Sequence, residues 1–216
     1  MSVKARWLGH AAVLLEGDGR KVLIDPFLSG NPKAAARPEE IEADMVLLTH
    51  DHEDHVGDLE YFLKAGAVFV GIHELAVDYA EKGYAAEGMN IGGTIEVRGI
   101  KIHMTHALHT SRVGHVVGFV IEFSDRQIYH AGDTGLTMDM KILAEFFSID
   151  LAFLPIGDRY TMGVPSAAVA AAWCGAQKVV PIHYNTWPLI EADTEEFRKR
   201  LGEKAVILEP GGTIEV

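Results

Sequence analysis

Apolar and polar residues alternate in short blocks along the 216-residue chain. In the first half, this pattern predicts strands at residues 3–8, 12–16 and 21–25, and the mainly apolar run 43–48 is typical of a buried strand. A helix is predicted to follow at residues 58–64. The first half therefore predicts an α/β arrangement in which strands alternate with helices.

The second half of the chain continues this alternation. Residues 115–123 and 126–130 predict a hairpin, and residues 165–174 predict a helix. This helix is expected to end at Gly175, because glycine suits the left-handed position after a helix. No linker, repeat or low-complexity tract interrupts the sequence, and 48% of its residues are hydrophobic. We expect one domain spanning residues 1–216, or two fused halves around a shared core.

The segment of residues 49–55, T-H-D-H-E-D-H, places three imidazoles and three carboxylates directly after the buried strand. His50 and His52 can bind one ion, because residues two apart on an extended chain point the same way. Asp54 and His55 diverge unless the backbone turns there, in which case they can face a second ion. A solvated loop is the alternative, but imidazole and carboxylate ligands at this spacing favour Zn, Fe or Mn.

The arrangement H-x-H-x-D-H after a hydrophobic strand resembles the signature of the metallo-β-lactamase superfamily. The resemblance implies a four-layer αββα sandwich and three further ligands at strand ends. Asp133 in Y-H-A-G-D-T and His183 in V-V-P-I-H-Y fit two of these positions. His103, His106 and His109 compete for the third, and the run A-L-H-T-S makes His109 the best match to the family's pattern.

The resemblance implies that one metal is held by His50, His52 and His109. It implies that a second metal is held by Asp54, His55 and His183, and that the Asp133 carboxylate bridges the two metals. The expected cofactors are two divalent ions, with zinc first and manganese or iron as alternatives. Such ions would make a hydroxide nucleophile available at neutral pH. Asp54 is predicted both to hold metal and to orient the hydroxide or relay its proton.

Several residues outside this ligand set are predicted to support the site or contact the substrate. Asp25 resembles the family's aspartate that braces the metal loop, although a turn before proline would also explain it. Four candidates follow two other predicted strands, whose end loops typically line substrate sites: Asp158, Tyr160, Thr161 and Asn185. His10 could face the mouth of the site or be an ordinary structural histidine.

Charge and cysteine content restrict the possible partners and location. With 31 acidic and 19 basic residues, the chain has a formal net charge of −12, which argues against a polynucleotide substrate. RNase Z shares the signature, but a resemblance to RNase Z would also imply a protruding arm that grips tRNA. No segment of this sequence is long enough to form such an arm. No apolar stretch reaches the length of a membrane span or resembles a signal peptide. The single cysteine, Cys174, excludes an internal disulfide, and we expect a cytoplasmic location.

The predicted activity is metal-dependent hydrolysis of a small-molecule ester, lactone or phosphodiester. The sequence resembles a branch related to ascorbate-6-phosphate lactonase. We expect a small-molecule substrate and expect that the protein binds neither nucleic acid nor a membrane. The sequence is compatible with a homo-oligomer. The alternatives are an RNase Z-like phosphodiesterase, a di-iron redox protein such as the superfamily members that act with a flavin domain, and a protein that only senses or stores metal.

Overall fold

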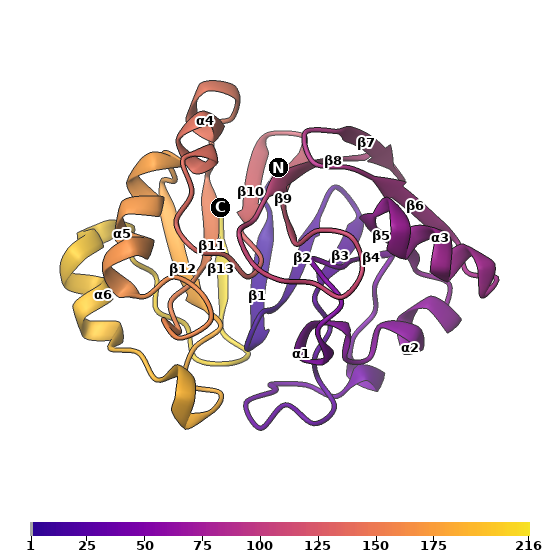
Figure 1. Cartoon of the computed structure of the whole chain (residues 1–216), viewed down its shortest axis with the longest axis horizontal. Helices are drawn as coiled ribbons and strands as arrows, with labels where there is room; N and C mark the ends of the chain where they lie inside the picture. The colour runs from indigo at the N-terminus through magenta and orange to yellow at the C-terminus, as the bar shows by residue number, and fades with distance from the viewer. Residues whose placement is uncertain (1) are drawn as a thin grey trace.

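The computed structural model describes residues 2–216 and shows two β-sheets stacked face to face (Figure 1). Among these residues, the first sheet has seven strands, in the spatial order β13 (Thr213–Glu215), β1 (Lys4–Gly9), β2 (Ala12–Gly17), β3 (Arg20–Ile24), β4 (Met45–Leu47), β5 (Val68–Ile72) and β6 (Ala86–Met89). The second has six strands, in the order β12 (Lys178–Ile182), β11 (Leu151–Pro155), β10 (Arg126–His130), β9 (Val117–Phe123), β8 (Ile100–His106) and β7 (Thr94–Val97).

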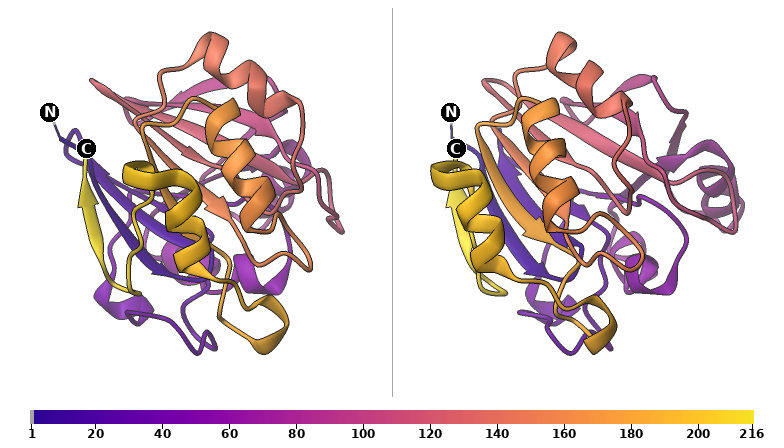
Figure 2. Two further views of the ribbon diagram at one scale, coloured as in Figure 1. Left: turned by 90° about the vertical axis from the view of Figure 1, so that its left-hand side faces the viewer. Right: turned by 60° about the vertical axis from the view of Figure 1, so that its left-hand side comes forward.

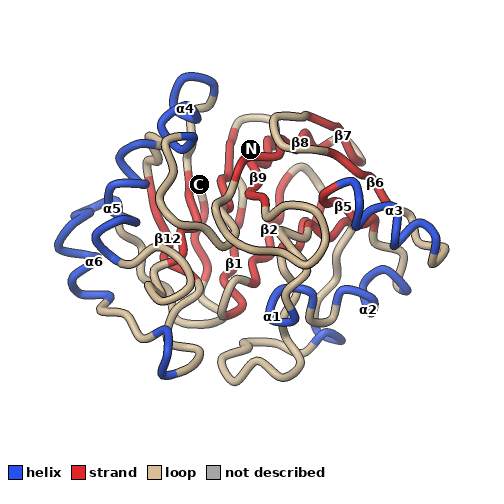
Figure 3. Tube along the Cα trace, viewed as in Figure 1, coloured by secondary structure: helices blue, strands red, loops and turns tan. Residues whose placement is uncertain are grey.

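Helices lie on the outer sides of the two sheets (Figures 2 and 3). The helices and 3-10 turns are α1 (Glu53–Val56), α2 (Leu59–Lys64), α3 (His73–Glu81), α4 (Asp139–Phe146), α5 (Val164–Trp173), α6 (Thr194–Leu201), η1 (Pro38–Glu40), η2 (Pro188–Ile190) and η3 (Gly202–Lys204). Helices α2 and α3 pack on the first sheet, whereas α5 packs on β11 with α4 and α6 beside it. This order of layers confirms the predicted αββα sandwich. None of the described helices is long and apolar enough to cross a membrane.

The parallel strands of the two sheets include the most completely buried ones. Strands β3, β4 and β5 pair in parallel, as do β10, β11 and β12, and all side chains of β4 and β11 are buried. Such strands are covered on both faces, which explains the uninterrupted apolar runs in the sequence. Burying one large side chain such as Phe153 contributes roughly 1.5–3 kcal/mol to stability. The shared core holds the loops at the ends of these strands in place.

The predicted boundaries differ from the observed ones at the H-x-H-x-D-H motif. The predicted strand at residues 43–48 is shorter in the structure and spans Met45–Leu47; just before it, the Asp44 side chain accepts a hydrogen bond from the Lys21 backbone. The helical turn α1 begins directly after His52, before the predicted helix. The backbone therefore turns at Asp54 and His55, which is the condition for both side chains to face one ion. The predicted hairpin and the helix that ends before Gly175 are confirmed.

Gly132 separates β10 from Asp133 and has a positive φ of 63°. A Cβ atom there would collide with the carbonyl oxygen of Val117 and lie 3.2 Å from the Thr49 side chain. We therefore expect Gly132→Ala to lower the free energy of unfolding by about 3 kcal/mol, measured by urea denaturation. The matched control is Gly19→Ala, because Gly19 has a similar φ of 71° but no atom near its missing Cβ. The control should lose only about 1 kcal/mol, and equal losses would contradict the close approach at Gly132.

Candidate metal centre

Strands of both sheets end at one edge of the sandwich, and polar residues follow six of these strand ends. In the first sheet, β1 leads to His10, β3 to Asp25 and β4 to the segment 49–55. In the second sheet, β8 leads to His109, β10 to Asp133 and β12 to His183, directly or through a short loop. The β4 segment also forms α1, which lies at the lower edge of the molecule in Figure 1. The hydrogen-bonded strands hold these positions, so residues distant in the sequence become neighbours.

The first group of possible metal ligands contains His50, His52 and His109. Each offers a ring nitrogen, and the three nitrogens lie within 4.8 Å of one another. The closest pair is Nε2 of His50 and Nδ1 of His52, 2.9 Å apart. The rings of His50 and His109 are nearly perpendicular, with centroids 5.5 Å apart. Three nitrogens that converge in this way are suited to hold one ion.

The competing histidines of β8 do not join this group. Nδ1 of His103 lies 2.7 Å from the hydroxyl of Thr94 on the neighbouring strand. His106 is paired with Asp139 at 3.1 Å, on the side of the second sheet that carries α4. The structure thus places His109, and neither of the other two, beside His50.

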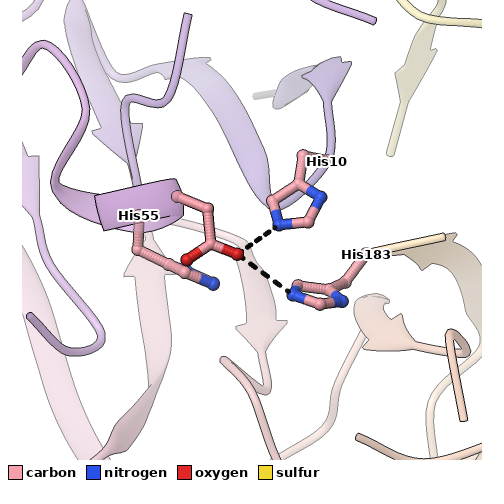
Figure 4. Close-up of side chains that lie close together, drawn as sticks. His10, His55 and His183 are labelled. Carbon is pink, nitrogen blue, oxygen red and sulfur yellow. Dashed lines mark hydrogen bonds and ion pairs between the residues drawn. The ribbon is translucent and has the colours of Figure 1, made fainter. Parts of the chain in front are cut away.

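The second group contains His10, Asp54, His55 and His183, whose ligand atoms also lie within 4.8 Å of one another. Figure 4 shows the three histidines turned toward a common point. The two dashed lines end on Oδ2 of Asp54, which is 3.1 Å from Nε2 of His10 and 3.8 Å from Nε2 of His183. The turn at α1 and the end of β12 therefore bring together residues 129 positions apart, since 183 − 54 = 129.

Asp133 lies between the two groups and is almost completely buried. Its Oδ2 atom is 3.4 Å from Nε2 of His55 and 3.1 Å from Nε2 of His183, both in the second group. The same oxygen is 3.7 Å from Nε2 of His109, in the first group. The Asp133 carboxylate is thus close enough to nitrogens of both groups to share a metal ion with each group.

Asp25 is fully buried and fixes the orientation of His55. Its carboxylate accepts hydrogen bonds from the backbone N–H of Thr49 at 2.8 Å and from the Thr49 hydroxyl at 2.7 Å. It also lies 2.7 Å from Nδ1 of His55, so this nitrogen carries the proton and donates it. The other ring nitrogen of His55, Nε2, lies 3.4 Å from Oδ2 of Asp133. A carboxylate that orients an imidazole in this way is the usual support of a metal-binding histidine.

Several buried nitrogen and oxygen atoms at this edge have no hydrogen-bond partner and are placed to bind a metal ion. Among residues 2–216, Nε2 of His55, both ring nitrogens of His183 and Oδ1 of Asp133 are buried without a hydrogen-bond partner. Two ligands bound at about 2.1 Å to one tetrahedral ion are separated by roughly 3.4 Å. The distances from Asp133 to His55 and His183, 3.4 and 3.1 Å, agree with this value. The residues present therefore fit divalent metal ions.

The protonation states of His50 and of the two carboxylates suit metal binding. Burial, together with the charge of His55, lowers the pKa of His50 to about 2, so its ring is neutral and can offer a lone pair. Burial alone would raise the pKa of Asp133, but His183 and His55 outweigh it and hold the pKa well below its usual range. Burial is likewise outweighed at Asp54, whose pKa is lowered by the hydrogen bond with His10 and by the charge of His55. Both carboxylates are thus ionised at neutral pH.

His10 is the main site residue that the sequence left undecided. It is fully buried, and burial lowers the pKa of its ring to about 4. Because ionised Asp54 can only accept, Nε2 of the neutral ring carries the proton, and Nδ1 accepts one from the Thr186 hydroxyl 2.8 Å away. Both nitrogens are engaged, so His10 holds the Asp54 carboxylate in position. Its place directly after a strand, like that of Asp25, is the signal that identifies it.

Three residues that follow strand ends adopt left-handed backbone conformations. The φ angles are 53° at His10, 46° at Asp25 and 52° at His183. Each such conformation costs a non-glycine residue on the order of 1 kcal/mol or more, and residues of this kind concentrate at functional sites. The sharp turns direct these three side chains toward the site instead of continuing the strand pattern.

An open pocket of about 350 Å³ leads to the two groups. Among the described residues, it is lined by His52, Asp54, His109, Thr110, Asp133, Tyr160 and His183. Of the residues predicted to contact substrate, the structure brings Tyr160 to this pocket, and it also brings Thr110, which the sequence did not single out. The backbone N–H of Asp158 and the hydroxyl of Thr161 donate to the carbonyl of Met162, and the side-chain oxygen of Asn185 accepts from the backbone of Ala192, so these bonds lie within their own loops.

The role of Asp25 can be tested separately from that of the ligands. We expect Asp25→Asn to weaken metal affinity by about 10- to 100-fold, because the amide no longer accepts all three hydrogen bonds and His55 loses its fixed orientation. Competition with a coloured chelator measures this affinity. The matched control is Asp58→Asn, since Asp58 accepts two backbone hydrogen bonds, from Leu28 and Ser29. Metal affinity should be unchanged in the control, and an equal loss in both variants would contradict a specific role for Asp25.

The αββα fold and its edge of histidines and aspartates define a class of metal-dependent enzymes. A family model described as Beta-lactamase superfamily domain matches residues 4–183, and the chain belongs to this superfamily. It is similar to UPF0173 metal-dependent hydrolases from Thermococcus onnurineus, with 49% identity over 99% of this chain and 100% of the relative, and from Methanopyrus kandleri, with 47% identity over the same shares.

A solved structure agrees with this classification. The metallo hydrolase Igni18 from Ignicoccus hospitalis superimposes with a TM-score of 0.94 and 38% sequence identity, covering 100% of this chain and 99% of that chain. The predicted superfamily, fold and enzyme class are therefore confirmed. The resemblance to the ascorbate-6-phosphate lactonase branch stays a prediction.

Proposed function

We propose that this enzyme hydrolyses a small-molecule ester, lactone or phosphodiester at a centre of two divalent metal ions. The position of Asp133 carries the proposal, because its Oδ2 atom lies within 3.7 Å of donor nitrogens from both groups. A carboxylate placed in this way is suited to bridge two ions, whereas a single ion would leave one group of nitrogens unused. We assign the first ion to His50, His52 and His109, and the second to Asp54, His55 and His183.

Two bound divalent ions would supply Lewis acidity and make a hydroxide nucleophile available at neutral pH. We propose zinc, because imidazole and carboxylate ligands in compact groups suit it well, with manganese or iron as alternatives. Iron would give the purified protein a visible absorption, whereas zinc is colourless. A coloured protein that contains iron and hydrolyses none of the test substrates would therefore indicate a di-iron redox protein instead.

Asp54 has a second role in this proposal, as an acceptor of the proton that the nucleophile loses. Its side chain is 30% exposed and lines the pocket, while its low pKa keeps it ionised. His10 donates to Oδ2 and so limits rotation of the carboxylate. A base held in a fixed position within reach of the substrate shortens the path of the proton.

The pocket favours a small substrate. Its volume of about 350 Å³ is near the lower end of the range for small-molecule sites. No lysine or arginine is among the described residues that line it, so the single negative charge of a phosphodiester would find a counter-charge only in the metal ions. The net charge of −12 also disfavours a polynucleotide. An ester or lactone fits this environment better than a phosphodiester does.

The positioning role of His10 predicts a specific kinetic effect. We expect His10→Gln to lower kcat by about tenfold, because the Asp54 carboxylate loses its fixed orientation, while KM and metal content change little. Steady-state kinetics together with elemental analysis measures these quantities. A variant that loses one metal ion per chain would show instead that His10 is itself a ligand.

The proposed reaction is tested with chromogenic or pH-indicator assays of lactones, carboxylic esters and phosphodiesters. Apoprotein prepared with a chelator is compared with the same sample after addition of zinc, manganese or iron. We expect hydrolysis of one bond class that requires added metal and is lost in His183→Ala. Activity that survives complete metal removal would contradict the proposal, as would a metal-loaded protein that hydrolyses none of the three classes.

A further inference from the structure

His109, a proposed ligand of the first ion, lies in the irregular loop 107–116 between β8 and β9. The ladder of backbone hydrogen bonds between these two strands ends at the pair formed by His106 and Val117. Residues 107–116 belong to no helix or strand. Other contacts must therefore hold the His109 side chain beside the rest of its group.

On the side of the loop before His109, the backbone of Leu108 provides one anchor. The Leu108 N–H donates to the Thr134 hydroxyl at 2.9 Å, and the Leu108 carbonyl accepts from the Gly135 N–H at 3.0 Å. The Leu108 side chain is 58% exposed, so apolar burial contributes little to this anchor. The two hydrogen bonds tie the loop to the residues that directly follow Asp133 in the sequence.

On the side of the loop after His109, the Asp51 carboxylate provides a second anchor. Its Oδ1 atom accepts hydrogen bonds from the Ser111 hydroxyl and from the Arg112 backbone N–H, both at 2.8 Å. The Ser111 hydroxyl is equally far from the Val113 carbonyl, so its single proton is donated to only one of these acceptors at a time. The bond from the Arg112 N–H is the more specific of the two, because this proton has a fixed direction.

Asp51 stands between His50 and His52 in the sequence, so the second anchor ties the loop to the other two members of the first group. An ion pair of 3.8 Å between Arg112 and Glu53 joins the same two segments, but both side chains are exposed, and such pairs contribute little. A zinc ion binds histidine nitrogens at about 2.0–2.1 Å, with a tolerance of about 0.2 Å. The three nitrogens must therefore keep their relative positions, and Asp51 is placed to maintain them.

We propose that Asp51 is a positioning residue, which fixes the loop 107–116 and thereby sets the affinity of His109 and its group for the first metal ion. Asp51 acts through the loop, because none of the groups of possible ligands within residues 2–216 includes it. The same anchor fixes Thr110, which lines the pocket next to His109. The inference rests on the two-ion centre proposed above, so its test measures the affinity for each ion.

Zinc is titrated into the full-length apoprotein, and calorimetry with a competing chelator gives the affinity for each ion. We expect Asp51→Ala to weaken the binding of one ion by about 10- to 100-fold and to leave the other unchanged. In Asp51→Asn, the amide oxygen can accept the same two hydrogen bonds, so both affinities should stay within about threefold of the wild type. A loss in Asp51→Asn as large as that in Asp51→Ala would show that the charge of Asp51 matters instead of its position, and would overturn the proposal.

The matched control is Asp18→Ala, because Asp18 has the same kind of contacts away from the metal ligands. Its Oδ2 atom accepts from the backbone N–H of Ser124 at 2.7 Å and from the Ser124 hydroxyl at 2.9 Å, which joins the turn after β2 to the turn after β9. The control loses two hydrogen bonds, as Asp51→Ala does, but should keep both zinc affinities. An equal loss of zinc affinity in the two variants would mean that general destabilisation explains the effect, and would overturn the proposal.

The double variant Asp51→Ala/His109→Ala shows whether Asp51 acts through His109. Because His109→Ala alone should remove the first ion, adding Asp51→Ala should not change the affinity for the remaining ion. A further loss in the double variant would overturn the proposal, as would unchanged binding in Asp51→Ala alone. The two-ion centre fails in a different way, through a wild-type protein that binds a single ion. The comparison of Asp51→Ala with Asp18→Ala would then still decide whether Asp51 sets the affinity for that ion.

Discussion

Asp133→Asn is expected to lower kcat/KM by about 10³-fold and to reduce the metal content from two ions per chain to one or fewer. The substitution keeps the size of the side chain but removes the negative charge that both metal ions would share. A loss of about 4 kcal/mol in transition-state stabilisation corresponds to this reduction in rate. Kinetic assays on the substrate identified from the panel, with elemental analysis of the same samples, measure both effects.

The matched control for this variant is Asp139→Asn, which removes a carboxylate six residues farther along the chain. Asp139 is exposed and pairs with His106, outside both groups of metal ligands. Its loss should leave kcat/KM and metal content within about twofold of the wild type, as is usual for an exposed ion pair. Two metal ions in the Asp133→Asn protein, with nearly normal activity, would contradict the bridging role.

His109→Ala and His106→Ala should differ strongly, although the two residues are only three positions apart. His109 lies beside His50 and His52, so its loss should remove one metal ion per chain and lower kcat/KM by about 10²- to 10³-fold. His106 is about one-third exposed and lies against Asp139, so its loss should change neither quantity by more than about twofold.

The same pair of variants tests the choice among the three histidines near the end of β8. Both proteins should be folded, which circular dichroism and urea denaturation can verify before the assays. The reverse ranking, with a large loss for His106→Ala and little change for His109→Ala, would mean that the ligand set of the first metal ion is wrong.

Much of the fold could be predicted from the sequence because some of its strands are unusually apolar. The run at residues 43–48 contains β4, which is buried on both faces, and such a run is typical of a strand covered on both sides. The H-x-H-x-D-H motif was equally informative, because its spacing requires a turn at Asp54, and α1 provides that turn. These local features, together with the family resemblance, predicted the αββα order.

The contacts that complete the site could not be predicted in the same way. His10 and Asp54 are 44 residues apart, and their 3.1 Å contact depends on the pairing of strands in the first sheet and on a left-handed turn after β1. The Asn185 side chain instead bonds to the backbone of Ala192, which depends on the shape of the following loop. Neither hydrophobic periodicity nor motif spacing contains this information. The position of a residue after a strand end indicates the edge on which it lies but not the direction of its side chain.

Bound metal is also expected to stabilise the folded enzyme. In the absence of metal, the buried nitrogens of His183 and Nε2 of His55 have no hydrogen-bond partner among the described residues. Ions that bind these atoms only in the folded state shift the folding equilibrium by mass action. The melting temperature should therefore rise with zinc concentration, and the rise should be smaller in His183→Ala.

Native mass spectrometry of the protein saturated with zinc tests the two-ion centre most directly, because it counts the ions on each intact chain. We predict a mass that corresponds to two zinc ions per chain for the wild type and to one zinc ion per chain for His109→Ala. A wild-type protein that binds only one ion at saturation would contradict the dinuclear centre and the bridging role of Asp133.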